Sequence, residues 1–270
     1  MNFKRVISGL IGFIFVVLVF IFGNVHIIDV LVSAIAVISM YEYISCFKSK
    51  EKAKPISWIC YASCLSIAAL HFIKSEYLIY AICLFIPISM LLLFCHVIFS
   101  ELKTTPADIA VTLFGILYIV IFYACIPMIF GLDNGKFYIW YIVFISWGTD
   151  VFAYAIGRRF GKHKFSKVSP NKSIEGCVAG TIGAIVLSTV YTIVLNNCFG
   201  FNINYFIILG ISFVLSLVGQ IGDFSASSIK RYTGIKDFGN LIPGHGGMLD
   251  RFDSIMFIAP FAFVLFLLIF

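Results

Sequence analysis

Long, uninterrupted apolar stretches are the feature that most constrains this chain. Each is close to the length of about 20 apolar residues that a helix needs to cross the hydrocarbon core of a bilayer, and short polar loops separate them. Of the 270 residues, 61% are hydrophobic and 12% charged, far more apolar than a soluble domain of this size requires. Strands of a transmembrane barrel alternate in polarity, whereas these stretches are uniformly apolar. We therefore expect an all-α polytopic membrane protein.

The hydropathy pattern predicts about nine transmembrane helices. They are expected at 6–22, 27–46, 56–73, 77–99, 109–130, 137–157, 177–198, 203–222 and 254–270. The first follows Lys4 and Arg5 and resembles a signal peptide, but no small-x-small cleavage pattern follows it, so we expect an uncleaved helix.

Basic residues indicate the orientation. Loops on one side of this arrangement hold 17 of the 19 Lys and Arg residues, which leaves Lys74 and Lys136 on the other side. The positive-inside rule then places the N-terminus and the large polar loops in the cytosol. The formal charge of +6 is confined to short loops beside apolar segments, as topology signals are, so we expect no nucleic-acid partner.

The eight cysteines lie in or beside apolar stretches, and none forms a CxxC pair. Cys60 and Cys64 share a helical face, but no histidine is near them in the sequence. We expect packing rather than metal binding.

A polar segment from Gly219 to Asp253 interrupts the apolar C-terminal half. It contains four acids, four bases and one histidine: Asp223, Asp237, Asp250, Asp253, Lys230, Arg231, Lys236, Arg251 and His245. If the preceding helix continues, Asp223, Ser227, Lys230 and Arg231 fall at i, i+4, i+7 and i+8, on one face. Such a mixture suits a polyanion with its metal ion; the alternative is a solvated loop whose acids balance its bases.

The turn from Pro243 to Gly247 carries three glycines around His245. With so little side chain, the backbone N–H groups of Gly246 and Gly247 can approach a ligand and bind phosphate oxygens. Asp250 and Asp253 follow directly, and carboxylate oxygens are the ligands that Mg²⁺ uses when it shares phosphate ligands with a substrate.

A second polar cluster ends the predicted sixth span. Asp150, Tyr154 and Arg158 lie on one helical face, and Ser169 and Lys172 precede the seventh span. An acid inside a span is a candidate functional residue; the alternative is a structural pairing of Asp150 and Arg158 through Tyr154. For Glu42, in the second span, there are two interpretations: it faces a catalytic cavity or, more simply, it extends to the membrane interface.

The polar segment resembles the signature of the phosphatidate cytidylyltransferases, also called CDP-diacylglycerol synthases. It reads Ser-Ser-Ile-Lys-Arg at 227–231, Lys-Asp-Phe-Gly at 236–239 and Ile-Pro-Gly-His-Gly-Gly-Met-Leu-Asp-Arg-Phe-Asp at 242–253. The second cluster is also similar to this family, although Asn171 and Ser173 stand where Lys and Thr are commoner. The resemblance covers roughly 145–254.

This resemblance implies a reaction of CTP with phosphatidate that gives CDP-diacylglycerol and pyrophosphate. It implies a membrane scaffold at 1–130 and a catalytic region at 131–270 with cytosolic loops 158–176 and 223–253. Mg²⁺, with a possible second, monovalent cation, is the expected cofactor, and a homodimer in the bacterial inner membrane the expected assembly. The residues expected to carry the chemistry are Asp223, Lys230, Arg231, Lys236, Asp237, His245, Asp250 and Arg251. Those expected to bind substrate are Asp150, Tyr154, Arg158, Ser169, Lys172, Ser227, Gly246 and Gly247, and the expected metal ligands are Asp223, Asp250 and Asp253.

Other activities remain open from the sequence. A transporter of anionic solutes also uses intramembrane acids, although it ordinarily shows paired broken helices and pseudo-repeats. A CTP-dependent polyprenol or dolichol kinase resembles the family in its nucleotide region, and the released product, CDP instead of pyrophosphate, separates the two. A CDP-alcohol phosphotransferase is disfavoured because its Asp-x-x-Asp-Gly-x-x-Ala-Arg pattern is missing.

Overall fold

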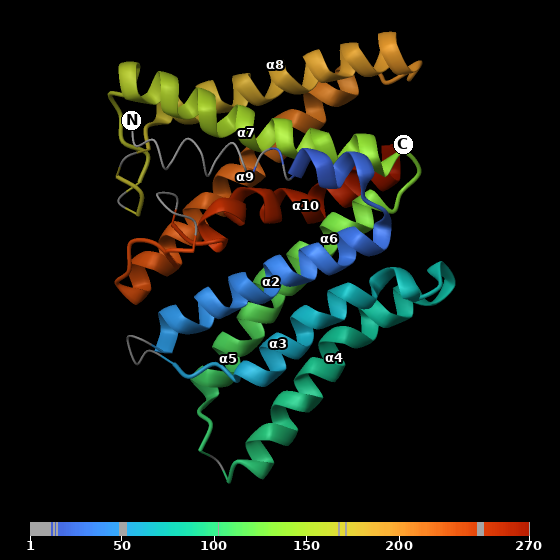
Figure 1. Ribbon diagram of the computed structural model, residues 1–270. Coiled ribbons are helices and arrows are strands. Elements are labelled where there is room, and N and C mark those ends of the chain that lie inside the picture. The colour runs from blue at the N-terminus through green and yellow to red at the C-terminus, as the bar shows by residue number, and fades with distance from the viewer. Residues whose placement is uncertain are drawn as a thin grey trace. The chain divides into compact units, whose positions relative to one another are not determined.

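The fold is helical throughout the part of the chain that the computed structural model describes, which comprises residues 12, 14, 16–48, 53–101, 103–166, 168–170, 172–241 and 246–269. These residues form no strand, and an isolated antiparallel bridge joins Lys164 to Ser173. The all-α prediction is confirmed. Figure 1 shows the helices in chain order.

The elements are α2 (Val25–Lys48), α3 (Ser57–Leu65), the 3₁₀ segment η1 (Ser66–Phe72), α4 (Ser75–Phe99), α5 (Pro106–Gly115), the π-helical segment η2 (Ile116–Ile121), α6 (Phe122–Phe130), α7 (Gly135–Phe160), α8 (Ile174–Phe199), α9 (Tyr205–Thr233) and α10 (Leu249–Ile269). The described residues include seven helices that are long and apolar enough to span a membrane, with α5, η2 and α6 forming one of them.

The predicted number of nine spans stays a prediction. The stretch predicted at 56–73 forms a shorter apolar helix, Ser57–Phe72, whose second half tightens to 3₁₀. The stretch predicted at 6–22 lies partly outside the described residues. Every other predicted span coincides with one of the seven long helices, to within a few residues at most ends.

The chain divides into two compact units. Unit 1 comprises 1–131 and 232–251, and unit 2 comprises 132–231 and 252–270. One boundary between the units therefore falls next to the predicted boundary at 130. Residues 232–251, which belong to the polar segment from Gly219 to Asp253, group with the N-terminal helices. Whether unit 1 is only a scaffold stays a prediction.

In unit 1, α2 packs against α3, η1 and α6 (Figure 1). Polar side chains join these apolar helices: the Asp29 carboxylate accepts hydrogen bonds from the ring Nδ1 of His71 at 2.7 Å and from the His71 backbone N–H at 3.2 Å. The start of α5 is fixed locally, because Thr105 and Asp108 cap each other's backbone N–H groups and Pro106 occupies the first turn. Polar groups in a membrane protein need internal partners of this kind.

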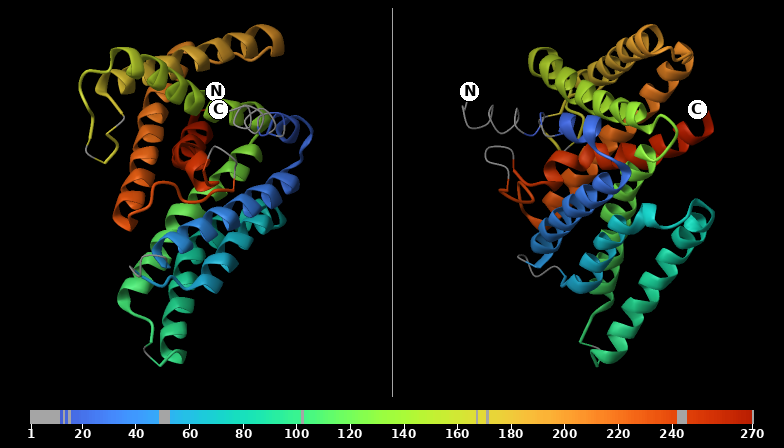
Figure 2. Two further views of the ribbon diagram at one scale, coloured as in Figure 1. Left: turned by 60° about the vertical axis from the view of Figure 1, so that its left-hand side comes forward. Right: turned by 45° about the vertical axis from the view of Figure 1, so that its right-hand side comes forward.

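In unit 2, α7 and α8 pack side by side in all views (Figures 1 and 2). Small residues allow this approach. A Cβ added to Gly180 would lie 2.7 Å from the carbonyl oxygen of Thr149, and one added to Gly148 would lie 2.9 Å from the Cα of Ala184. Close backbone contact of this kind replaces the hydrophobic effect, which does not drive helices together in lipid.

Buried hydroxyl and amide groups connect α7, α8 and α9. Thr149 Oγ1 and Ser216 Oγ lie 2.9 Å apart, and Gln220 Nε2 donates to Thr181 Oγ1 at 3.0 Å. Because such groups have no water to bond inside a bilayer, their pairing fixes the rotation of α9. That rotation determines the direction in which the face of α9 that carries Asp223 is turned.

Candidate active site

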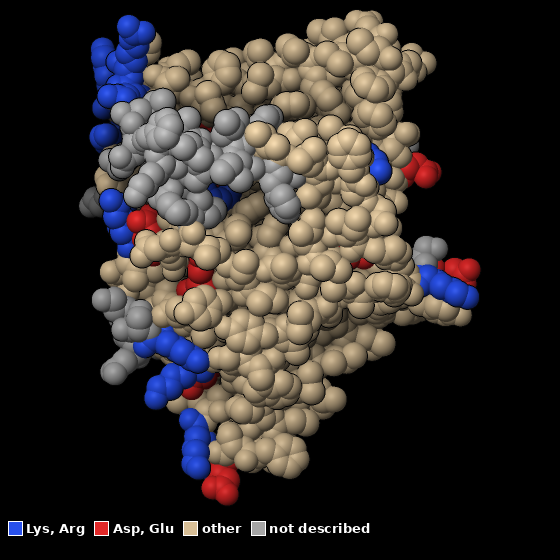
Figure 3. Space-filling model, in the orientation of Figure 1, with Lys and Arg blue, Asp and Glu red and all other residues tan. Residues whose placement is uncertain are grey.

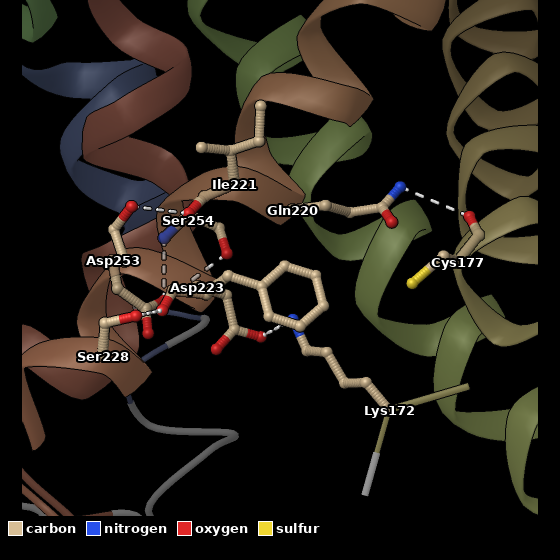
Figure 4. Close-up of polar contacts among 10 residues, drawn as sticks. Lys172, Cys177, Gln220, Ile221, Asp223, Ser228, Asp253 and Ser254 are labelled. Carbon is tan, nitrogen blue, oxygen red and sulfur yellow. Dashed lines mark hydrogen bonds and ion pairs between the residues drawn. The ribbon is translucent and has the colours of Figure 1, made fainter. Parts of the chain in front are cut away.

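Asp223 lies at the centre of a charged cluster in unit 2. It forms an ion pair with Lys172, and both side chains are about one-quarter exposed. The two residues come from different predicted clusters, Lys172 from the loop before α8 and Asp223 from α9. Figure 4 shows the lysine extending toward the carboxylate.

Lys172 is held by more than its ion pair. Its Nζ lies 4.3 Å from the centroid of the Phe224 ring, and that ring stacks on Phe165 with centroids 4.7 Å apart. A cation over an aromatic face is attracted by the ring quadrupole. The backbone N–H of Lys172 also donates to the Ser169 carbonyl at 3.1 Å, so Ser169 contributes a turn that positions the lysine.

Asp253, in the second turn of α10, is 8% exposed. Its carboxyl interacts electrostatically with Asp223, Lys230 and Asp150. Its Oδ1 accepts the backbone N–H of Ser254 at 2.7 Å, as Figure 4 shows. Asp223, Asp150 and Lys230 therefore lie within electrostatic range of Asp253, and Lys172 is paired to Asp223.

Glycines bring α9 and α10 close enough for this cluster. A Cβ on Gly222 would lie 2.7 Å from the carbonyl oxygen of Asp253 and 2.7 Å from the Cβ of Phe257. One on Gly219 would lie 2.8 Å from Ile258. The acid on α9 and the acid on α10 can approach because their helices do so at these two glycines.

The C-terminal end of α7 carries a separate polar contact. Arg158 Nη1 donates to the Tyr154 hydroxyl at 3.1 Å, and both side chains are exposed. This is half of the structural pairing of Asp150 and Arg158 through Tyr154 that the sequence left open. Next to it, Glu175 bonds the His163 ring at 2.7 Å, and the Ser173 hydroxyl caps α8 by accepting from the Gly176 N–H.

Lys and Arg gather at this end of α7 and α8, over the loop that joins them (Figure 3). Arg231, in the last turn of α9, donates from Nε to the Val168 carbonyl in the same loop at 3.3 Å. Ser227 is half-buried one turn after Asp223. The result is a positively charged rim on unit 2, where an anionic ligand is favoured.

In unit 1, Asp250 binds the backbone of the loop that precedes α10. It is 6% exposed, and its Oδ2 accepts the backbone N–H groups of Phe238 at 2.8 Å and Gly247 at 3.1 Å. Gly246 adopts a φ of 87°, and a Cβ there would lie 3.2 Å from the same oxygen and 3.6 Å from the Cβ of Asp237. Asp237, Gly246, Gly247 and Asp250, all of them predicted site residues, therefore lie close together.

The remaining predicted residues are placed as follows. Lys236 is exposed in the loop that follows α9, and Arg251 is exposed in the first turn of α10. His245 lies outside the described residues, so its predicted role is not described. Among the residues that are described, no group of three or more His, Cys, Asp or Glu side chains is arranged to hold a metal ion, and the metal set Asp223, Asp250 and Asp253 stays a prediction.

Glu42 was misjudged from the sequence. The interpretation that it extends to the membrane interface is wrong, because it is 4% exposed. Its two oxygens accept the backbone N–H groups of Met248 at 2.9 Å and Leu249 at 2.8 Å, at the start of α10. The available signal was an acid inside an apolar span, which usually has a partner.

An apolar cavity of about 870 Å³ lies between α8 and α9 in unit 2. Its walls include Val178, Ile182, Ile185, Phe213, Leu217 and Ile221. Phe165 and Phe224, the rings next to Lys172, also line it. Volumes of roughly 300 to 1,000 Å³ are typical of small-molecule sites.

A polytopic helical membrane protein with an acidic cluster, a basic rim and an adjoining apolar cavity belongs to the class of integral membrane proteins that have a charged site. The chain matches the model of the cytidylyltransferase family over residues 3–269. It therefore belongs to the cytidylyltransferase family.

Curated relatives carry a more specific name. Proteins named phosphatidate cytidylyltransferase are 45% identical over 131 residues in Staphylococcus aureus (strain COL), covering 47% of this chain and 48% of that protein. The identity is 38% over 174 residues in Staphylococcus haemolyticus, covering 63% of each chain, and 37% over 179 residues in Bacillus subtilis, covering 66% of this chain and 65% of the relative. In the first of these matches the chain spans about half the length of its relative.

Proposed function

We propose that this protein transfers the cytidylyl group of CTP to phosphatidate, giving CDP-diacylglycerol and pyrophosphate. Membership of the cytidylyltransferase family and the name of the curated relatives support a nucleotidyl transfer from CTP. The observation that carries the lipid half of the proposal is the apolar cavity beside the Lys172–Asp223 pair.

The length of the cavity matches the thickness of the hydrocarbon core in one lipid leaflet. Its apolar wall on α9 extends from Phe224 to Phe213, which at about 1.5 Å per residue is roughly 16 Å. The hydrocarbon core is about 30 Å thick, so a lipid in one leaflet extends over about half of it. An acyl chain of phosphatidate in this cavity has its phosphate at the Lys172 end.

The reaction needs charge neutralisation and alignment more than it needs a strong base. A phosphatidate phosphate is anionic near neutral pH, so one of its oxygens attacks the α-phosphorus of CTP, the bond to the bridging oxygen breaks, and pyrophosphate leaves. Two polyanions must be held together, and preorganised positive groups lower that barrier. Lys172, Lys230 and Arg231 in unit 2 are the bases suited to this role.

Mg²⁺ is the proposed cofactor. Asp223 and Asp253 supply hard carboxylate oxygens within electrostatic range of each other, which is the donor chemistry that this ion takes, and Asp250 is the further predicted ligand. When bound, the ion neutralises triphosphate charge and orients the leaving group. The protein's own contribution is to hold the acids on two helices that meet at Gly222.

Orientation and assembly belong to the same proposal. The basic rim of unit 2 supports a cytosolic active site, since basic loops face the cytosol, and the named relatives are bacterial, which supports the inner membrane. A homodimer and a second, monovalent cation remain proposals that rest on the family resemblance.

The test is a product analysis on purified protein in detergent micelles with phosphatidate, labelled CTP and Mg²⁺. We expect a lipid-extractable cytidine product together with pyrophosphate. The control is Asp250→Asn: both loop N–H groups bond the same oxygen of Asp250, and the amide oxygen of Asn can still accept them, so the variant removes the charge but keeps these two bonds. Release of CDP with a phosphorylated polyprenol acceptor would instead identify a kinase.

A further inference from the structure

Glu42 is a buried carboxylate from α2 that binds the loop before α10 within unit 1. One of its oxygens accepts the N–H of Met248 and the other accepts the N–H of Leu249. The first N–H groups of a helix have no partner within the helix and carry its positive end. A carboxylate from a distant helix supplies both of these partners here.

The loop backbone also encloses the carboxylate. A Cβ added to Gly239 would lie 2.5 Å from Glu42 Oε1, and one added to Gly247 would lie 2.5 Å from Glu42 Oε2. Real Cβ atoms do not approach an oxygen so closely, so a larger residue at either position would displace the Glu42 carboxylate. Glu42 therefore fits the loop by shape as well as by hydrogen bonding, and it contacts the loop near both of its ends, at Gly239 and at Gly247.

The same loop holds Asp250. Gly247 contacts Glu42 through its Cα side and donates its N–H to Asp250 Oδ2, while Phe238, adjacent to Gly239, donates to that same oxygen. A displacement of Glu42 is therefore transmitted to two of the N–H groups that bond Asp250. Two carboxylates, one from α2 and one from α10, bind the loop from different sides.

We propose that Glu42 is a positioning residue, which fixes the described parts of the loop, 238–241 and 246–249, and thereby the orientation of Asp250. The inference deepens the proposed function and rests on it for its kinetic test. The two N–H donors need two acceptor oxygens, so a carboxylate is required. An amide at this position offers one acceptor and presents its NH₂ group to the other N–H.

The experiment compares Glu42→Gln with Asp29→Asn. Asp29 is a matched control, because it is a fully buried carboxylate on the same helix whose hydrogen bonds go to His71. For Glu42→Gln we expect kcat to fall by about 10- to 100-fold, as for other residues that orient a functional group, with a smaller change in the KM for CTP. We expect Asp29→Asn to lower thermal stability with kcat unchanged.

Hydrogen exchange of peptides covering 238–250 supplies a readout that does not depend on activity. Glu42→Gln is expected to speed exchange in these peptides and Asp29→Asn is not. If the wild-type protein forms no CDP-diacylglycerol, the proposed function fails, whereas the exchange result still decides the inference. Wild-type kcat with unchanged exchange in Glu42→Gln overturns it.

Gly239→Ala covers the case in which Glu42→Gln does not fold, because it leaves Glu42 in the chain. Glu42 atoms are the nearest that a Cβ on Gly239 would meet, so Gly239→Ala should reduce kcat by displacing the carboxylate. In a Glu42→Ala background the obstruction is gone, and adding Gly239→Ala should cause no further loss. Fully additive losses in this double-mutant cycle would show that Glu42 does not hold the loop.

Discussion

Replacing Lys172 by Met tests whether this lysine binds the lipid phosphate. Met removes the charge and retains an unbranched apolar side chain that can cover the Phe224 ring. Because Lys172 and Asp223 are each about one-quarter exposed, their ion pair contributes at most about 1 kcal/mol to folding stability. Losing the cation above the ring adds about 0.5 to 1 kcal/mol. The folding stability should therefore fall by no more than about 2 kcal/mol.

The cost to substrate binding should be larger. A charge-assisted hydrogen bond to a phosphate is worth about 1.5 to 3 kcal/mol, and every 1.4 kcal/mol is about tenfold in an equilibrium constant. We expect kcat/KM for phosphatidate to fall by about 10- to 100-fold in Lys172→Met. The fall should be much smaller in Lys164→Met, an exposed lysine of the same loop.

The assay is the initial rate of CDP-diacylglycerol formation in mixed micelles, with the surface fraction of phosphatidate and the CTP concentration varied separately. Thermal unfolding of each variant checks that it is folded. A kcat/KM for phosphatidate within twofold of wild type in folded Lys172→Met would refute this role. A loss confined to the KM for CTP would assign Lys172 to the nucleotide instead.

Three further changes test the cavity, the acids and the helix contact. Ile182→Trp should fill the cavity and raise the KM for phosphatidate several-fold without affecting the KM for CTP, whereas Val190→Trp, on exposed α8 surface outside it, should not. Asp223→Asn and Asp253→Asn should each lower kcat by at least about 100-fold, the scale of one lost electrostatic contact, and weaken the Mg²⁺ response in a metal titration. Gly222→Ala should separate α9 from α10 and lower both kcat and thermal stability, by about 1 to 3 kcal/mol for the latter.

Each of these has a contrary outcome. Equal kinetics for the two Trp variants would show that the cavity does not hold an acyl chain. An unchanged Mg²⁺ titration in both Asn variants would remove these acids from the metal site, and chelation that left turnover unaffected would remove the metal itself. Wild-type kcat in Gly222→Ala would mean that the reaction tolerates displacement of α10 from α9.

Local patterns in the sequence predict the helices but not their pairings. The length of the apolar stretches is sufficient to predict the seven long helices, because the thickness of a bilayer sets that length directly. It did not reveal that Ser57–Phe72 tightens to 3₁₀ at Ser66, since both helix types satisfy the backbone within an apolar segment. There, Asp29 of α2 accepts the His71 N–H, a contact between separate segments that hydropathy does not encode.

The site was predictable to a similar extent. The helical spacing correctly put Asp223 and Lys230 on α9, and the cluster containing Lys172 was identified separately, but nothing in either pattern pairs Lys172 with Asp223. For Glu42 the apolar pattern indicates a location within a span but no partner. Its partners are backbone N–H groups, which every residue carries, so no residue type marks them in the sequence.

Close approach of backbones explains why glycines recur where the charges are. In unit 2, Gly222 lets α9 contact the turn of α10 that carries Asp253; in unit 1, Gly239 and Gly247 let the loop backbone enclose Glu42. At Gly239 and Gly247 a methyl group would displace Glu42 from its hydrogen-bond donors, and at Gly222 it would push α10 away from α9. Burying carboxylates in a membrane protein is costly unless they are partnered. The glycines are therefore the condition under which this chain can keep Glu42, Asp250 and Asp253 buried, and the polar segment is glycine-rich for packing reasons even where no glycine contacts a substrate.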